Sequence, residues 1–245
     1  MPLVMSILVG YDYRMNGMFS GKKALVVGGT GGIGRAISMA LQGAGAEVLA
    51  IGGHPLDGTT FLRVDLDSPE NCAIVCSKAS EADIVCCVRG PFLQKEVAAT
   101  SVDEWNSVVY ANLTLPGILV SAALPRMIER SWGRILLMGG TRTDRIRGFR
   151  TNAAYAAAKT GLSSLTRSVA HSYASHGITC NCICPGFVDT EYLDEATKTA
   201  LAAKNPDGAL ISATEIAEAG IFLLSHPSCN GICLPIDKGW QPSFG

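Results

Sequence analysis

Short apolar runs alternate with longer stretches of helical periodicity along most of the chain, beginning at Lys23. The apolar runs are rich in aliphatic and β-branched residues and predict strands near 23–28, 47–52, 61–65, 83–88, 134–139, 178–184 and 231–236. Helical spacing of apolar positions predicts helices near 32–44, 69–80, 102–130, 152–175 and 213–225. Apolar strands separated by helices are typical of a parallel sheet covered on both faces. The pattern therefore predicts a doubly wound α/β fold with a seven-stranded parallel sheet.

No repeat, low-complexity tract or linker interrupts this alternation, so we expect one domain over residues 21–245. Residues 1–20 contain a short apolar patch without a small-residue cleavage site and are expected to form a loosely ordered extension. The stretch 191–211 is polar, rich in alanine and broken by the turn sequence 205–208 (NPDG). This composition predicts a mobile segment that covers the substrate cleft.

Charge and hydropathy exclude several classes of partner. The chain has 20 Lys and Arg against 21 Asp and Glu, a formal net charge of -1 and a pI of about 6.4. This balance provides no field to hold nucleic acid or an anionic membrane. No apolar run reaches the roughly 20 residues that span a bilayer. We therefore expect a soluble, cytoplasmic protein that acts on small molecules.

The nine cysteines lie mostly inside apolar runs, as Cys86, Cys87, Cys180, Cys182 and Cys184 show. Cysteines in such positions are typical of buried thiols in a reducing cytosol. No group of Cys and His has the spacing of a zinc site, so we expect no metal.

A glycine-rich turn follows the first predicted strand. The aliphatic run 24–27 leads into Gly28-Gly29-Thr30-Gly31-Gly32-Ile33-Gly34, after which a helical period begins. A strand, a glycine turn and a helix N-terminus allow backbone N–H groups to approach a pyrophosphate with no side chain in the way. The alternative is a tight strand–helix loop that binds nothing.

A tyrosine and a lysine stand four residues apart, as Tyr155 and Lys159, near the start of a predicted helix. This spacing puts both side chains on one helix face. A free tyrosine has a pKa of about 10, and a nearby ammonium together with a cationic nicotinamide would lower that pKa. The pair could therefore exchange a proton with a substrate, whereas an exposed Tyr and Lys on a surface helix would do nothing.

Pro116 lies inside the predicted helix 102–130 and has no N–H to offer. The carbonyl of Asn112, four positions earlier, would then lack its helical partner. A water bound there could link Lys159 to bulk solvent and return a proton to Tyr155. The alternative is a helix kink with no proton traffic.

The glycine turn and the Tyr-x3-Lys pair, in this order and separation, resemble the short-chain dehydrogenase/reductase family, and the resemblance runs from about residue 20 to the end. It implies a Rossmann-like fold and a homotetramer or homodimer. In pattern the chain is most similar to the 3-oxoacyl-carrier-protein reductases, through residues 154–161 (AYAAAKTG). Asn112-Leu113 matches the family's catalytic asparagine, and residues 181–190 resemble the segment beside the nicotinamide.

This resemblance implies a set of site residues. The catalytic residues would be Asn112, Tyr155 and Lys159, with Thr141 in place of the family serine. The residues that contact the cofactor would be Gly28, Thr30, Gly32, Ile33, Gly34, Asp65, Leu66, Gly90, Tyr155, Lys159, Pro185, Gly186, Val188 and Thr190.

The chain departs from the family pattern at two places. The family's Asn-Asn-Ala-Gly is here Cys87-Val88-Arg89-Gly90, and Gly140 stands where the catalytic serine is expected. Because a lost oxyanion donor costs about 10²–10³ in rate, we expect a threonine hydroxyl, Thr141 before Thr143, to point at the substrate oxygen within reach of Tyr155.

The expected function is reduction of a 3-oxoacyl thioester by NADPH. The second predicted strand ends in Gly52-Gly53-His54, with no carboxylate to grip a ribose 2′-hydroxyl, which favours NADP over NAD. Thr30, Arg35 and His54 are the candidate partners of a 2′-phosphate. Dehydrogenation of a sugar, steroid or other secondary alcohol is an alternative, and so is a catalytically weak cofactor-binding sensor or scaffold.

Two further features bear on the substrate. Arg142, Arg145, Arg147 and Arg150 form a basic run before Tyr155, which is either a solvated loop or a dock for a substrate carried on CoA or acyl carrier protein. An enoyl reductase of this family would carry a tyrosine seven residues before the lysine, where this chain has Asn152. We therefore do not expect enoyl reduction.

Overall fold

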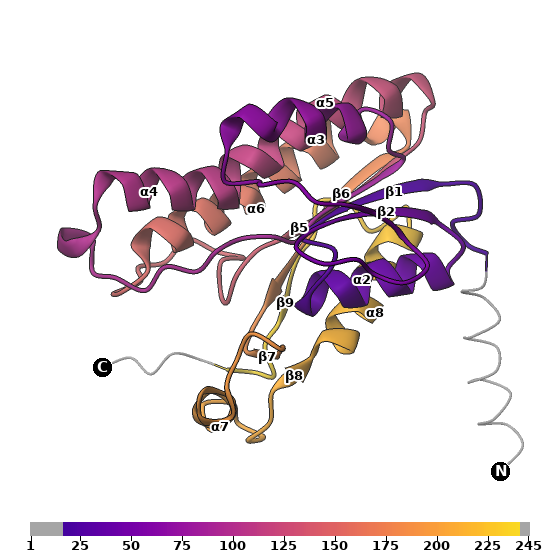
Figure 1. The fold of residues 1–245 in the computed structure, drawn as a ribbon. Coiled ribbons are helices and arrows are strands. Elements are labelled where there is room, and N and C mark those ends of the chain that lie inside the picture. Colours follow the sequence, from indigo (N-terminus) through magenta and orange to yellow (C-terminus); the bar gives the residue numbers. More distant parts are fainter. Residues whose placement is uncertain (1–16, 241–245) are drawn as a thin grey trace, which may run out of the picture.

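Seven parallel strands form the central sheet of the computed structural model, which describes residues 17–240 (Figure 1). The strands are β1 (Lys23–Val27), β2 (Glu47–Ile51), β3 (Thr60–Leu62), β4 (Ile84–Cys87), β5 (Gly133–Met138), β6 (Ile178–Pro185) and β9 (Cys233–Ile236). Their order across the sheet is β3-β2-β1-β4-β5-β6-β9. This confirms the predicted fold class. The order reverses between β1 and β4, and ligands of open α/β sheets bind at the carboxyl ends beside such a switch point.

Helices cover both faces of the sheet (Figure 1). Helices α2 (Gly32–Gly43) and α8 (Ala213–Ser225) pack together on one face. The other face carries α3 (Cys72–Ala79), α4 (Val102–Val109), α5 (Leu115–Glu129) and α6 (Ala153–Tyr173). The predicted helices are thus present, with their ends shifted by a few residues.

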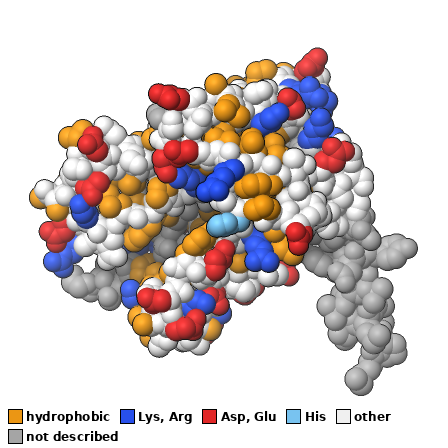
Figure 2. Space-filling view, in the orientation of Figure 1, with side chains coloured by type: hydrophobic (Ala, Val, Ile, Leu, Met, Phe, Trp, Pro, Cys, Tyr) orange, Lys and Arg blue, Asp and Glu red, His pale blue; other side chains and the backbone are white. Residues whose placement is uncertain are grey.

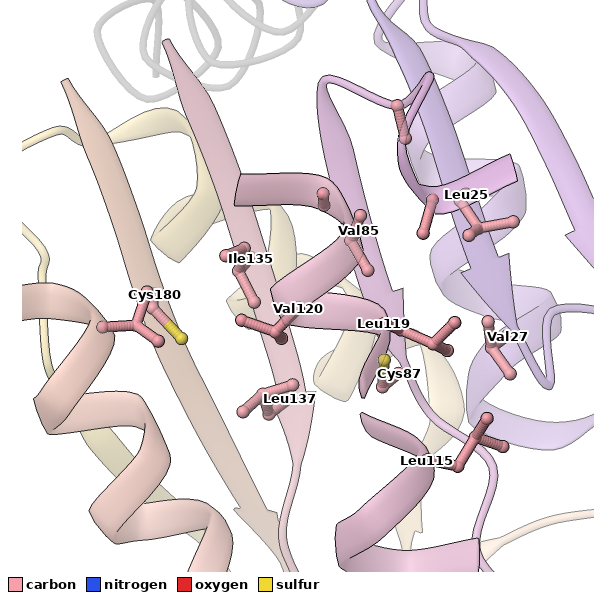
Figure 3. Close-up of a cluster of buried hydrophobic side chains, with 14 of the residues drawn as sticks. Leu25, Val27, Val85, Cys87, Leu115, Leu119, Val120, Ile135, Leu137 and Cys180 are labelled. Carbon is pink, nitrogen blue, oxygen red and sulfur yellow. The ribbon is translucent and has the colours of Figure 1, made fainter. Parts of the chain in front are cut away.

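Strand β5 shows why the central strands are mostly apolar. All six of its residues are buried. Ile135 and Leu137 belong to the core under α5, while Leu136 and Met138 belong to the core under α2 and α8. Figure 3 shows the first of these cores, in which side chains of the strands meet Leu119 and Val120 of α5. Full burial of each such side chain contributes about 1.5–3 kcal/mol, so the sheet is held from both sides.

The predicted helix 102–130 is divided in two by a π-helical turn, Tyr110–Thr114, that joins α4 to α5. Pro116 is at the second position of α5, where its missing N–H is tolerated. By length and hydropathy the run Val102–Glu129 could cross a membrane, contrary to our expectation from the sequence. Half of the most apolar 18-residue stretch of this run is buried inside the fold, so the run is a core helix.

An arm that was not predicted projects from the carboxyl end of the sheet (Figure 1). It consists of the short strands β7 (Val188–Asp189) and β8 (Ile211–Ser212), which pair in parallel, and helix α7 (Glu195–Ala202) between them. The stretch 191–211, expected to be a mobile segment, is therefore folded into this arm. Its role in covering a substrate stays a prediction.

The folded part begins earlier than expected. Phe19 is buried in the core beside α2, and its N–H donates to the carbonyl of Ala44 over 2.8 Å. Residues 17–20 therefore belong to the domain. The rest of the predicted extension lies outside the described residues.

All nine cysteines are free thiols, and Cys86, Cys87, Cys180, Cys182 and Cys184 are buried, as predicted. The other four are partly buried. Figure 2 shows acidic and basic side chains interspersed over one face of the molecule, in line with the near-zero net charge.

Candidate active site

The glycine turn connects β1 to α2 at the switch point of the sheet. Gly28 has a φ of 82°, and its N–H and that of Gly29 both donate to the carbonyl of Ile51 over 2.9 Å. A Cβ at Gly34 would overlap the carbonyl of Gly28, so the first turn of α2 packs directly on the loop backbone. The turn therefore presents bare backbone at the N-terminus of α2, as a pyrophosphate site needs.

Two adjoining cavities form a groove along this turn, with volumes of about 380 and 370 Å³. They share Gly28, Gly31, Arg89 and Tyr192. The first extends over the ends of β2 and β3, and the second runs along the start of α2 toward β4. The groove brings together most of the residues that we expected to contact the cofactor, namely Gly28, Thr30, Gly32, Ile33, Gly34, Asp65, Leu66, Gly90 and Thr190.

Three other expected cofactor residues lie beyond the groove, at and after the end of β6. Val188 is buried against Ile211 of β8 and acts in packing. A Cβ at Gly186 would lie 2.8 Å from the Cα of Asp237, so this glycine allows β6 and the segment after β9 to approach. The carbonyl of Pro185 accepts a hydrogen bond from Thr141.

The N-terminus of α2 holds a carboxylate from the arm. The N–H of Gly32 donates to Oε1 of Glu191 over 2.9 Å, and α2 has no acidic residue in its own first turn. The ring of Tyr192 lies against Gly31 and Gly32. Because a helix N-terminus favours anions, the Glu191 carboxylate occupies the position suited to a phosphate.

Arg89 supplies a second indication that the groove takes an anionic ligand. Its Nη2 lies 2.6 Å from a carboxylate oxygen of Asp67. Its Nη1 is buried and has no hydrogen-bond partner among residues 17–240. A buried donor without a partner is costly, and a bound phosphate or ribose oxygen would satisfy it. The residues present thus fit a nicotinamide dinucleotide.

Lys159 lies one helical turn after Tyr155 on α6 and is 2% exposed. Its Nζ donates to the carbonyl of Met138, at the end of β5, over 2.7 Å. Nζ lies 5.8 Å from the centre of the Tyr155 ring. Burial lowers the pKa of Lys159 to about 8, so the side chain is cationic at neutral pH and close to losing its proton.

Tyr155 packs edge-on against Phe92, with ring centres 5.0 Å apart. Burial, followed by the charges that Cys184 and Cys182 would carry, raises the pKa of the Tyr155 phenol above its ordinary value. We expected Lys159 and a cationic nicotinamide to lower this pKa. In the protein alone burial raises this pKa instead, and the phenol is protonated at neutral pH.

Asn112 is buried in the π-helical turn, so the helix is widened where Pro116 predicted a distortion. Its Nδ2 donates to the carbonyls of Val108 and Pro91, over 2.9 and 3.0 Å. Its Oδ1 is buried and has no hydrogen-bond partner in the part of the chain that the structure describes. A Cβ at Gly90 would overlap this oxygen and lie 2.7 Å from Nζ of Lys159, so the three groups converge. The relay water at the Asn112 carbonyl stays a prediction.

The two threonines expected to replace the family serine have other partners. Thr141 Oγ1 donates to the carbonyl of Pro185 over 3.0 Å. Thr143 Oγ1 is buried and bonded to both the N–H and the carbonyl of Gly140. Neither hydroxyl contacts Tyr155 among the hydrogen bonds of the described residues, so the expected pairing is not formed. The carbonyl at the end of β6 takes the hydroxyl of Thr141, and the backbone of the loop itself takes that of Thr143.

Tyr155 itself fills the space of the missing serine. A Cβ at Gly140 would lie 2.9 Å from both Oη and Cε1 of Tyr155. This is closer than side-chain atoms approach, so Gly140 is what permits the present position of the phenol.

The basic run before Tyr155 is only partly at the surface. Arg142, expected at the mouth of the site, is buried, with Nε 3.0 Å from Asp237, and it also donates to the carbonyl of Trp240. It anchors the loop after β5 to the segment after β9. Arg145 and Arg150 are exposed, and Arg147 stacks over Phe149.

Several residues of the groove were not predicted from the sequence. Arg89 replaces a small family residue, and its position directly after β4 could have indicated its place in the groove. Glu191 and Tyr192 reach the glycine turn only because the arm folds back across 159 residues of sequence separation. No local sequence pattern predicts such a contact.

Known proteins are similar to this chain in sequence. The model of the family described as enoyl-(acyl carrier protein) reductase matches residues 28–241. The 3-oxoacyl-[acyl-carrier-protein] reductase FabG of Escherichia coli (strain K12) is 33% identical and aligns with 84% of this chain and 91% of its own.

Two solved structures have a fold similar to that of this chain. A short chain dehydrogenase/reductase family protein is 27% identical, with a TM-score of 0.79 over 91% of this chain and 98% of its own. A putative NAD(P)-dependent gluconate 5-dehydrogenase from Beutenbergia cavernae, with bound NADP at low occupancy, is 27% identical, with a TM-score of 0.80 over 90% and 97%. The family match spans most of the chain, including the glycine turn, Tyr155 and Lys159. The chain is therefore a member of the short-chain dehydrogenase/reductase family of oxidoreductases.

Proposed function

We propose that this oxidoreductase reduces the ketone of a 3-oxoacyl thioester with NADPH. The observation that carries the proposal is the pair of Tyr155 and Lys159 on one face of α6, with Nζ 5.8 Å from the centre of the Tyr155 ring and close to Gly90 and Asn112. A protonated phenol is an acid that can donate to a carbonyl oxygen, as the reductive direction requires. The Escherichia coli relative is named for the same reaction.

The chain's own residues supply the proton and its replacement. When bound, the cofactor supplies the hydride. Tyr155 Oη donates a proton to the carbonyl oxygen of the substrate. Lys159 holds the nicotinamide ribose and stabilises the phenolate that remains. Asn112, at the π-helical turn, holds the water that returns a proton. Thr141 stays our candidate for an oxyanion donor, once its hydroxyl turns away from Pro185.

The end of β2 supports NADP(H) as the cofactor. Gly52 and Gly53 provide no carboxylate to repel a 2′-phosphate. A Cβ at Gly52 would overlap the hydroxyl of Thr30, which accepts a hydrogen bond from the N–H of Gly53 over 3.1 Å. Thr30 therefore excludes an aspartate from the position where this fold reads the ribose.

The basic residues that remain at the surface support an anionic carrier on the substrate. Arg145, Arg147 and Arg150 lie on the loop between β5 and α6, which leads into Tyr155. We propose that they bind the phosphate of a phosphopantetheine or its carrier protein, because guanidinium groups match phosphate geometry. By family resemblance we also propose a homotetramer or homodimer.

Two other substrates compete with this one. The structural similarity to a protein titled as a gluconate dehydrogenase favours a sugar alcohol as the second candidate. Enoyl reduction has less support despite the description of the matching family, because Asn152 stands where the enoyl reductases carry their tyrosine and here precedes the first turn of α6.

The function is tested by mixing the protein with NADPH and a panel of substrates and following the absorbance of the cofactor. The panel contains a 3-oxoacyl carrier-protein thioester, its CoA thioester, a small neutral ketone, a keto-sugar acid and an enoyl thioester. We expect turnover of the 3-oxoacyl thioesters and a loss of at least about 10²-fold in Tyr155→Phe.

A triple variant, Arg145→Gln with Arg147→Gln and Arg150→Gln, should raise KM for the carrier thioester and leave that for the neutral ketone unchanged. Arg142 stays in place because it is structural. Preferential turnover of the sugar acid would replace the proposed substrate by the second candidate. Equal effects of the triple variant on both ketones would show that the loop binds no carrier.

A further inference from the structure

The cofactor's 2′-phosphate needs a cation, and the end of β2 has none. Gly52 and Gly53 occupy the positions from which this fold reads the ribose. His54 follows them and is exposed. Binding of a 2′-phosphate rests on the proposed use of NADP(H). A candidate residue for it follows the neighbouring strand β3.

Arg63 lies directly across the sheet from Gly52. Strands β2 and β3 pair in parallel with Ile51 opposite Leu62, so the next pair in this register is Gly52 and Arg63. The N–H of Gly52 lies 3.4 Å from the carbonyl of Leu62, which continues the ladder. Arg63 is therefore the closest cross-strand neighbour of the ribose-reading position.

The side chain of Arg63 leaves the sheet on the same face as the missing side chain of Gly52. Ile51 and Leu62 both pack on the core under α3 and α5. Successive residues of a strand point to opposite faces, so Gly52 and Arg63 both point to the face covered by α2. That face is where the hydroxyl of Thr30 lies against Gly52.

Arg63 also lines the cavity of about 380 Å³ that contains Gly52, Gly53 and Thr30. Its side chain is exposed, and it forms no ion pair and no side-chain hydrogen bond within residues 17–240. The other arginine of this cavity, Arg89, pairs with Asp67 through Nη2, which leaves only its buried Nη1 without a partner among residues 17–240, for a phosphate or ribose oxygen of the cofactor. The carboxylate nearest to Arg63 in sequence, that of Asp65, accepts a hydrogen bond from the N–H of Asp67, and that of Asp67 pairs with Arg89.

We propose that Arg63 is the residue that binds the 2′-phosphate of NADP(H). Its guanidinium offers two parallel N–H donors to a phosphate, and Thr30 adds a hydroxyl at the floor of the same cavity. The discriminating charge has thus moved from the end of β2 to the end of β3, on the same face of the sheet.

The experiment measures binding by calorimetric titration, without turnover. The ligands are NADPH, NADH, adenosine 2′,5′-bisphosphate and adenosine 5′-monophosphate, where the last two differ only in the 2′-phosphate. Arg63→Gln should weaken NADPH and the bisphosphate by about tenfold or more, since a charged hydrogen bond is lost, and leave NADH and the monophosphate within about twofold. Arg63→Lys, which keeps the charge but not the two-pronged geometry, should recover part of the affinity.

Lys23→Gln is the matched control, because it removes one exposed positive charge at the amino end of β1, the end of the sheet opposite to the groove. It should leave all four affinities unchanged. A wild-type protein that binds neither nicotinamide dinucleotide would contradict the proposed function itself. A wild-type protein that prefers NADPH, with Arg63→Gln retaining that preference or weakening all four ligands equally, would overturn the role of Arg63 alone.

Discussion

Tyr155 and Gly140 are coupled at the level of single atoms, because the phenol occupies the space that a serine would need. Restoring the family residue by Gly140→Ser therefore introduces a Cβ only 2.9 Å from Oη. We expect this substitution to displace Tyr155 and to lower kcat/KM by at least about tenfold, in line with an overpacking cost of about 1–3 kcal/mol.

Gly140→Ala is the matched control, since it adds the same Cβ without a hydroxyl. Both variants should lose activity to a similar extent in steady-state kinetics. An increase in kcat for Gly140→Ser alone would mean that the site lacks only its hydroxyl and that the phenol can move without cost.

Lys159 sets a pH dependence of stability. Its pKa is about 8 in the folded protein against an ordinary 10.5, so between these values the unfolded chain holds more protons and the free energy of unfolding rises with pH. Lys159→Met avoids the buried charge. At pH 7 we expect it to be more stable than wild type by up to about 3 kcal/mol, with the difference shrinking as pH rises through this window.

Denaturant unfolding at pH 7 and pH 10 measures this difference, and Lys23→Met, at an exposed position, serves as the control for loss of a lysine. Lys159→Met should also have no reductase activity. A stability difference that does not vary with pH would show that Lys159 is solvated in the folded protein.

At the residue scale the sequence predicts which residues are candidates for the site better than it predicts where their side chains point. The closeness of Tyr155 and Lys159 could be anticipated, because a spacing of four puts both side chains on one face of α6. Their catalytic role and that of Asn112 stay predictions. The directions of the Thr141 and Arg142 side chains could not be predicted. Thr141 bonds to Pro185 and Arg142 pairs with Asp237, and both partners lie far away in the sequence. Such choices depend on the tertiary arrangement.

At the scale of elements, the arm between β7 and β8 brings its own anion to the glycine turn. Glu191→Gln keeps the shape of the side chain and removes the charge that competes with a phosphate for the N–H of Gly32. We expect the variant to bind NADPH about two- to fivefold more tightly, the size of a charge effect at a helix N-terminus.

Fluorescence titration of the cofactor checks this, with Glu195→Gln as control, because Glu195 lies on α7 of the same arm and is exposed. Unchanged affinity in Glu191→Gln would mean that the carboxylate leaves the turn without cost. Weaker affinity would mean that Glu191 supports the bound cofactor.

The elements themselves were predictable where the pattern is long. The seven strands of the sheet were found because they are mostly apolar, and β4, β5 and β6 are buried on both faces. Strands β7 and β8 were missed, since each has only two residues and no period to detect. The widened turn at Asn112 was anticipated from Pro116, although its π-helical form was not.

At the scale of the whole molecule, the order of the strands explains why the site lies where it does. The chain runs from β1 outward to β3 and then returns to place β4 on the other side of β1. The glycine turn, Arg89 and Asn112 lie close together where the strand order reverses, between β1 and β4. The alternation of strands and helices predicted the class of fold, and only the family resemblance implied the rest of the topology.

The buried thiols of β4 and β6 tie the protein's resistance to oxidation to its folding equilibrium. Burial raises the pKa of Cys86, Cys87 and Cys180, so these side chains carry almost no thiolate in the native state. An oxidant can reach them only in the rare molecules whose sheet has opened. Any mutation or heating that loosens the sheet would therefore expose the thiols at its centre to oxidation.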